Sequence, residues 1–322
     1  MTQGTARVPP IEKIVVITQK TLLDELVERF NTRDQARFYI EHAGESFAEY
    51  QDAHDTYKRA RDCVAAALPQ GVRAQFVDRG FLPNFLFGER DLAVTLGRDG
   101  LVVNTAKYLR GQPLLAVNPD PARIDGVLIP FRVEEAGRAL ARAVEDSAPW
   151  TRVSMACAQL SDGQRILAVN DLFIGQRTHV SARYRLELAG RQEDQISSGI
   201  IVSTGAGSTG WFRSILTGAA EVVESYQGGQ AVGDTRDRYR FGWDADYLYY
   251  GVREPFISRV SGAELVFGRV TAGEALRITS YMPQNGVIFS DGVEADRLDF
   301  NSGATARVGL ADEFLRLVVP GA

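Results

Sequence analysis

Apolar residues in the first half of the chain form short continuous runs, and stretches with helical spacing separate these runs. The runs that predict buried strands are 13–18, 72–77, 91–96 and 114–117, and the stretches that predict helices are 21–43, 45–68 and 133–144. Continuous apolar strands that alternate with helices are typical of a parallel sheet covered on both faces. We therefore expect an α/β domain in the first half.

The pattern changes near Trp150, after which apolar and polar residues alternate. In one segment Tyr184 and Leu186 face one way, while Arg183 and Arg185 face the other. Short segments of this kind lie at 165–169, 198–203, 263–270, 275–281 and 286–290. One helix is expected over 208–226 and a polar, glycine-containing loop over 227–244. Such alternation predicts antiparallel sheets packed as a sandwich or an open barrel.

Composition narrows the class of protein. The chain has 322 residues, a net charge of -5 and 45% hydrophobic residues, which fits a globular protein of about two domains. A weakly acidic chain offers no general attraction to nucleic acid or to an anionic membrane. Two distant cysteines and three histidines argue against a metal site built from these residues. The sequence shows neither a signal peptide nor a membrane-spanning run, so we expect a cytoplasmic protein.

The motif Gly97-Arg98-Asp99-Gly100 follows the apolar run 91–96 and precedes a helix-like stretch at 102–109. A glycine turn at this point lets the backbone approach a phosphate, and the helix N-terminus supplies N–H donors. Asp99 can accept the proton of a substrate hydroxyl as its oxygen attacks phosphorus. The alternative is an ordinary strand-to-helix turn in which the aspartate caps the helix.

A second motif ends the run 198–203 in a loop of small residues, 203–210, followed by Trp211. Its glycines match G-x-G-x-x-G, but the neighbouring strands have the antiparallel pattern, and no lysine completes a phosphate-binding loop of the Walker type. Hydroxyls and free N–H groups suit a nucleotide, and Trp211 can stack on a ring. The alternative is a tight turn whose glycines serve packing.

Two shorter motifs contain aspartate. Asn170 and Asp171 interrupt an apolar run, and this pair can contact a base edge and ribose hydroxyls. On the local pattern alone, a turn at the end of a strand is the better explanation of the pair. The dipeptide Asp291-Gly292 is typical of a hairpin turn and says nothing about function by itself.

Taken together and in this order, the motifs resemble those of the NAD kinase family. The mitochondrial-type branch is the most similar. Its Val-Asn-x-Asp-Pro, Ser-Ser-Gly, Thr-Gly-x-Gly-Ser and Arg-Glu-Pro motifs occur here at 117–121, 197–199, 204–208 and 253–255. Its Asn-Glu-Val-Phe-Ile-Gly stretch corresponds to Asn170-Asp-Leu-Phe-Ile-Gly175. The resemblance runs from about residue 10 to the end of the chain.

The resemblance implies a fold and a reaction. The fold would be a Rossmann-like α/β domain of residues 10–148 plus 296–322 and an antiparallel β-sandwich domain of residues 149–295, with NAD bound between them. The reaction would move the ATP γ-phosphoryl group to the 2′-hydroxyl of NAD(H), with Mg²⁺ held by the ATP phosphates. The protein would form a homodimer or homotetramer. The alternatives are a kinase of another nucleoside or sugar hydroxyl, and a catalytically idle nucleotide-binding protein.

The resemblance also implies roles for residues. Asp99 would be the general base, and the glycine turn would meet ATP. Adenine and ribose would contact Asn170 and Asp171. The full nucleotide-binding set would be Gly97, Arg98, Gly100, Asn170, Asp171, Ser198, Thr204, Gly207, Ser208, Thr209, Trp211, Ser214, Asp291 and Gly292.

Three positions depart from the family pattern. Arg98 replaces a glycine, and its guanidinium would either clamp a phosphate or fill the space of a triphosphate. Leu101 replaces a threonine, which removes a hydroxyl near the phosphates. Ser198 stands where many members have aspartate, although the mitochondrial-type branch also has serine.

Overall fold

The computed structural model describes residues 11–228 and 239–321, so most of the loop expected at 227–244 lies outside the described residues. The chain forms two compact units. One runs up to Thr151 and resumes at Arg316, and the other is Arg152–Leu315. The domain boundaries predicted from the sequence were 148/149 and 295/296.

The first unit contains a parallel sheet in the order β17-β4-β3-β1-β2. Its strands are β1 (Lys13–Thr18), β2 (Arg73–Asp78), β3 (Asp91–Leu96), β4 (Pro113–Asn118) and the end of β17 (Thr305–Val318). The short β5 (Phe131–Arg132) pairs with the end of β4. The runs 13–18, 91–96 and 114–117 are mostly buried in the sheet, whereas β2 at its edge buries only Val77. The predicted α/β class is confirmed.

Helices α3 and α5 cover the sheet with an apolar core that includes Val64, Leu140, Val94 and Leu115. The helices of this unit are α1 (Leu22–Phe30), α2 (Arg33–His42), α3 (Phe47–Ala66), α4 (Asp99–Ala106) and α5 (Ala136–Val144), with short 3₁₀ turns at Arg79–Asn84 and Val133–Glu135.

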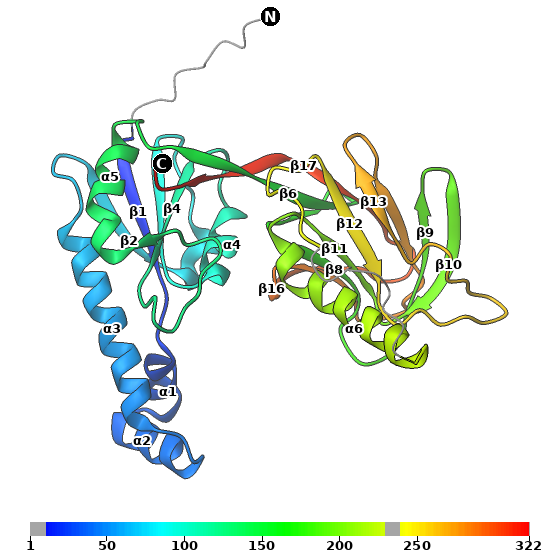
Figure 1. The fold of residues 1–322 in the computed structure, drawn as a ribbon, viewed down its shortest axis with the longest axis horizontal. Helices are drawn as coiled ribbons and strands as arrows, with labels where there is room; N and C mark the ends of the chain where they lie inside the picture. The colour runs from blue at the N-terminus through cyan, green and yellow to red at the C-terminus, as the bar shows by residue number, and fades with distance from the viewer. Residues whose placement is uncertain (1–10, 229–238, 322) are drawn as a thin grey trace, which may run out of the picture. The chain divides into compact units, whose positions relative to one another are not determined.

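The helix expected over 21–43 is in fact two helices. Asn31, in the left-handed conformation with φ 66°, ends α1, and the Thr32 side chain caps α2 by accepting from the Gln35 N–H at 3.2 Å. These two helices pack against the start of α3 through Leu23, Ile40 and other apolar residues. Figure 1 shows α3 running past the sheet, with α1 and α2 at its far end. We call α1, α2 and the first half of α3 the helical arm.

The second unit packs two layers of antiparallel strands. One layer is a six-stranded sheet in the order β13-β12-β11-β8-β15-β16. Its strands are β8 (Asp171–Gln176), β11 (Ile200–Ser203), β12 (Tyr247–Val252), β13 (Phe267–Thr271), β15 (Gly286–Ser290) and β16 (Val293–Asp299). The other layer consists of β6 (Trp150–Leu160), β7 (Arg165–Ala168), β9 (Ala182–Leu188), β10 (Arg191–Ser197), β14 (Leu276–Ser280) and β17.

Both layers of the second unit contribute to one apolar core. Ile174 and Ile200 come from the six-stranded sheet, and Tyr184, Leu186 and Ile278 come from the other layer. The burial of Tyr184 and Leu186 confirms the predicted alternation and the sandwich. Helix α6 (Trp211–Tyr226) packs on the outer side of the six-stranded sheet. None of the helices in the described ranges is long and apolar enough to cross a membrane.

Candidate functional site

The Gly97–Gly100 turn lies at the carboxyl end of β3, and α4 begins directly after it at Asp99. The Asp99 carboxylate accepts the N–H of Val127 at 3.0 Å and the N–H of Leu128 at 2.7 Å. Arg98, not Asp99, is the N-cap residue of α4. Asp99 therefore does not act as a simple helix cap, because its charge is held by the backbone of the loop that follows β4.

This geometry leaves Asp99 able to accept a proton. A carboxylate has about four lone-pair sites, and the two backbone N–H groups occupy one on each oxygen. The side chain is half-buried and anchored, so a substrate hydroxyl at its free lone pairs would meet a fixed acceptor.

The two glycines of the turn, Gly97 and Gly100, differ in the space available for a side chain. A Cβ on Gly97 would lie 2.9 Å from the Cδ2 of Leu101, which is buried beneath the turn. Leu101 thus fills protein interior at the position where the family pattern has a hydroxyl. A Cβ on Gly100 would meet no atom within 4 Å. A side chain at position 97 would have to displace the end of Leu101, whereas the space beside Gly100 is open.

Arg98 is exposed at the start of α4. Within the described ranges, 11–228 and 239–321, its guanidinium has no hydrogen bond or ion pair. The side chain is consequently not committed to the fold and is able to meet an anion near the N-terminus of the helix.

In the second unit, Asp291 and Gly292 form the turn between β15 and β16. Both have positive φ, 54° and 71°, as a two-residue hairpin of type I′ requires. The Asp291 carboxylate also accepts the N–H groups of Val169, Asn170 and Asp171 at 3.1, 2.7 and 3.2 Å. Two motifs that lie about 120 residues apart therefore form one structural element.

Two hydroxyls of the 203–210 loop, those of Thr204 and Ser208, point into the protein. The Thr204 hydroxyl donates to the Val169 carbonyl and accepts the Gly207 N–H at 3.2 Å, and its own N–H donates to the Asn170 carbonyl at 2.9 Å. The Ser208 hydroxyl donates to the Gly205 carbonyl at 2.7 Å. Both side chains are fully buried, so they hold the loop against Asn170.

The glycines of this loop are required by close backbone contacts. A Cβ on Gly207 would lie 2.1 Å from the Asn170 carbonyl oxygen, and one on Gly205 would lie 1.8 Å from the Gly242 carbonyl oxygen. Neither neighbour is a flexible side chain. For Thr204, Gly207 and Ser208 the packing interpretation is the one that the contacts support.

Aromatic side chains line the outer side of the six-stranded sheet next to this loop. The Trp211 ring stacks on Phe173 with centroids 5.7 Å apart and planes 4° apart, and the Arg253 guanidinium lies 5.4 Å from the Trp211 centroid. Gly199 leaves room for the Phe173 ring, because a Cβ there would approach the ring to 2.8 Å. Phe173 and Arg253 are not among the site residues predicted from the sequence, although Arg253 begins the Arg-Glu-Pro motif.

The remaining predicted residues lie at different places around this group. Ser198 precedes β11, while Thr204 follows it, so the strand separates them. Ser198 is exposed, and its N–H donates to the Arg253 carbonyl at 2.9 Å. Thr209 is half-buried in the short turn before α6, and Ser214 is exposed on the first turns of that helix.

Asp171 has an unusual electrostatic environment. Its side chain is buried, and it lies near the negative charge of Asp291. Burial, and secondly this charge, raise the pKa of Asp171 from 3.8 to about 7. Near neutral pH the residue can therefore either accept a hydrogen bond as a carboxylate or donate one as a carboxylic acid.

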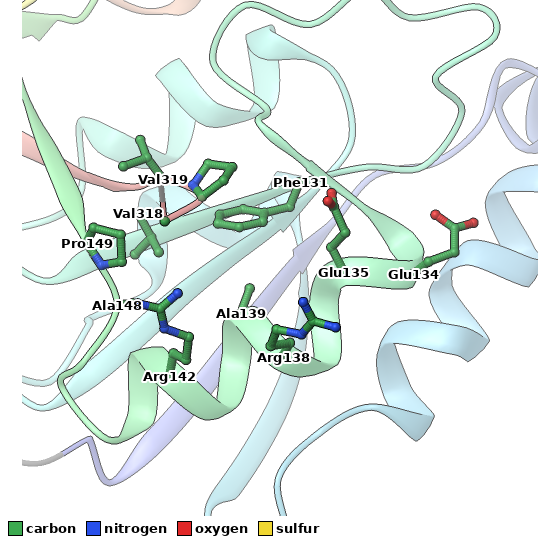
Figure 2. A pocket seen from close by; sticks show the side chains of 12 residues that line it. Phe131, Glu134, Glu135, Arg138, Ala139, Arg142, Ala148, Pro149, Val318 and Val319 are labelled. Atoms are coloured by element: carbon green, nitrogen blue, oxygen red, sulfur yellow. The ribbon is translucent and has the colours of Figure 1, made fainter.

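A separate cavity of about 390 Å³ lies in the first unit between α5 and the segment after β17. Figure 2 shows Phe131 and Val318 above α5 and Arg138 and Arg142 on it. It contains none of the predicted site residues. Among the residues that the structure describes, no three His, Cys, Asp or Glu side chains gather as a metal site would require.

Comparison with known proteins identifies the fold. Neither a protein-family model nor a curated protein matches the sequence. Yeast NADH kinase in complex with NADH superposes with a TM-score of 0.59 at 16% identity, covering 97% of this chain and 84% of that chain. An NAD kinase from Archaeoglobus fulgidus in complex with ATP superposes with a TM-score of 0.54 at 18% identity, covering 95% and 93%. The predicted NAD kinase-like fold is confirmed.

Because Gly207 lies against the Asn170 backbone, any larger side chain at this position should destabilise the protein. We expect Gly207→Ala to lower the free energy of unfolding by about 1–3 kcal/mol, because the added Cβ must displace the Asn170 backbone. Gly218→Ala is the matched control, since a Cβ there meets no atom within 4 Å and alanine favours the helix. Urea unfolding of both variants tests this, and equal stability of the two would contradict the assignment.

The raised pKa of Asp171 predicts a pH dependence of stability. A carboxyl whose folded pKa lies above its unfolded value stabilises the protein below about pH 4, and this contribution disappears as the pH rises to about 7. Asp171→Asn should therefore gain stability relative to wild type between pH 4 and pH 8, by roughly 4 kcal/mol at the upper limit. Urea unfolding at both pH values measures this, with exposed Asp312→Asn as the control. A pH-independent difference would exclude the raised pKa.

Proposed function

We propose that this chain, which has the NAD kinase fold, is a phosphotransferase that moves the γ-phosphoryl group of ATP to the 2′-hydroxyl of NAD(H), giving NADP(H). The observation that carries the proposal is the Asp99 carboxylate, anchored by two backbone N–H groups at the carboxyl end of β3 and the start of α4. The two similar structures, of an NADH kinase with NADH and an NAD kinase with ATP, supply the substrate class.

In this proposal Asp99 is the general base. The 2′-hydroxyl gives its proton to a free lone pair of the Asp99 carboxylate while its oxygen forms a bond to the γ-phosphorus. The bond between that phosphorus and the bridging oxygen breaks, and ADP leaves. Mg²⁺ held by the ATP phosphates would neutralise their charge. The backbone of Gly97 and Gly100 and the N-terminus of α4 face the phosphates.

Residues of the second unit would bind the acceptor substrate, NAD(H). Asn170 and Asp171 are held by Asp291, and we assign them to the adenine and ribose. Ser198, Thr209, Trp211 and Ser214 would line the same pocket. Thr204, Gly207, Ser208 and Gly292 act indirectly, because their contacts shape the loop and the hairpin turn.

The remaining features of the proposal follow the family resemblance. The working protein would be a homodimer or homotetramer of the mitochondrial-type branch, acting in the cytoplasm on small nucleotides. It would bind neither nucleic acid nor membrane.

Arg98 supports a second candidate function. Its exposed guanidinium has no described partner and stands where the family has a glycine. If it occupies the space of the triphosphate, the protein is an idle NAD or nucleotide-binding protein, or it phosphorylates another nucleoside or sugar hydroxyl.

The general-base assignment predicts the behaviour of Asp99→Asn. With ATP, Mg²⁺ and NAD, we expect NADP formation by wild type and a loss of about 10²–10⁴-fold in kcat for the variant. The amide also turns an N–H donor toward the Val127–Leu128 backbone, so the melting temperature is recorded as well. Asp125→Asn, an exposed residue of the same loop, is the control. Asp99→Asn turnover within a few-fold of wild type would refute the assignment.

Substitution of Arg98 separates the two candidate functions. If Arg98 clamps a phosphate, Arg98→Gly should raise the KM for ATP by roughly 10- to 100-fold, as expected for loss of a charged hydrogen bond. Arg98→Lys keeps the charge and should have a smaller effect. Steady-state kinetics of both variants measure this. A sharp rise in turnover for Arg98→Gly would instead favour the second candidate.

A further inference from the structure

The hydroxyl of Tyr57 lies between the carboxyl ends of two neighbouring strands. Tyr57 is on α3 and is 8% exposed. Its hydroxyl accepts the N–H of Gln19, just after β1, at 2.9 Å, and donates to the carbonyl of Leu96, the last residue of β3, at 3.2 Å. Burial raises the pKa of Tyr57 to about 12, so the hydroxyl keeps the proton that it donates.

The two backbone groups need this partner because the sheet ends between them. Strands β1 and β3 pair in register as far as Ile17 and Thr95. Beyond that pair, the buried Leu96 carbonyl and the half-buried Gln19 N–H bond the Tyr57 hydroxyl, and a buried backbone group without a partner is costly. A hydroxyl can donate and accept at once. Phenylalanine would fill the same volume and satisfy neither group.

The bridge also holds the glycine turn. Leu96 directly precedes Gly97, and Asp99 follows two residues later. On the other side, the Gln19 side chain lies 3.4 Å from the position that a Cβ of Gly97 would take. Tyr57 therefore bonds the backbone directly before the turn and the backbone of Gln19, whose side chain lies beside Gly97.

A second contact ties the same connection to α3. His54 lies one helical turn before Tyr57, and its Nδ1 is 2.8 Å from the Oγ1 of Thr21, the N-cap residue of α1. The Asp24 carboxylate is 3.6 Å from the same nitrogen. Helix α3 thus holds the chain between β1 and α1 at two points, and the helical arm is linked to the glycine turn.

We propose that Tyr57 is a positioning residue for phosphoryl transfer, whose hydroxyl sets the position of the Gly97–Asp99 turn and couples this turn to the helical arm. The proposal rests on the function proposed above. Tyr57 does not contact the substrate in this scheme, so it acts through Asp99. A tyrosine that serves only the core would change stability and leave the balance of kcat and KM untouched.

The kinetic test is Tyr57→Phe. We expect kcat to fall about 10- to 100-fold, since a small misplacement of reacting groups has effects of this size, while the KM for ATP and for NAD stays within about threefold. The control is Tyr50→Phe, on the same helix, whose hydroxyl bonds the Glu45 carboxylate within the arm. It should keep wild-type kcat. A Tyr57→Phe kcat within threefold of an active wild type would overturn the proposal.

Amide hydrogen exchange tests the positioning without any activity. The turn contains two bonded amides, Gly97 to the Val117 carbonyl at 3.3 Å and Leu101 to the Arg98 carbonyl at 2.8 Å. In Tyr57→Phe we expect peptides over 96–101 to exchange at least tenfold faster, while 113–118 keeps its rate. Unchanged exchange at the turn, or equally faster exchange along the whole chain, would overturn the proposal. If wild type makes no NADP, the proposed function fails and this readout alone decides on Tyr57.

Discussion

Backbone N–H and C=O groups at the ends of buried strands must find hydrogen-bond partners, and the structure of this protein depends on the side chains that supply them. Asp291 accepts three consecutive N–H groups at the start of β8, and Asp99 accepts two in the loop after β4. Thr204 and Tyr57 each bridge a donor and an acceptor. The motifs that suggest a nucleotide site are thus the same residues that complete the backbone hydrogen bonding.

Because these side chains bond the backbone, only some of them keep donors or acceptors that a ligand could use. A carboxylate anchored by N–H groups keeps a fixed position and still has free lone pairs, which is the property that a general base requires. The buried hydroxyls of Thr204 and Ser208, by contrast, already donate their protons to backbone carbonyls. Within the 203–210 loop, the nucleotide contacts proposed here fall to the half-buried Thr209, whereas Thr204 and Ser208 maintain the loop.

The charged residues Asp171 and Arg98 have contrasting environments. Asp171 lies beside Asp291 in a buried place, so its pKa approaches neutrality while Asp291 is held by backbone donors. The exposed Arg98 is the opposite case, a cation with no described partner at the start of α4. The fold sets the protonation behaviour of Asp171 through burial and Asp291, whereas Arg98 is exposed and can contact a ligand.

The sequence by itself determined the two kinds of unit, because continuous and alternating apolar patterns reflect sheets buried on two faces or on one. It also marked Asp99, Asn170, Asp171 and Asp291 through the order of their motifs. Only the tertiary structure decided that Asp291 supports Asn170, that Thr204 points inward, and that Tyr57 and Arg253 join these groups. Periodicity carries information about burial along one element, whereas a hydrogen bond between residues far apart in the chain depends on how the strands are brought together.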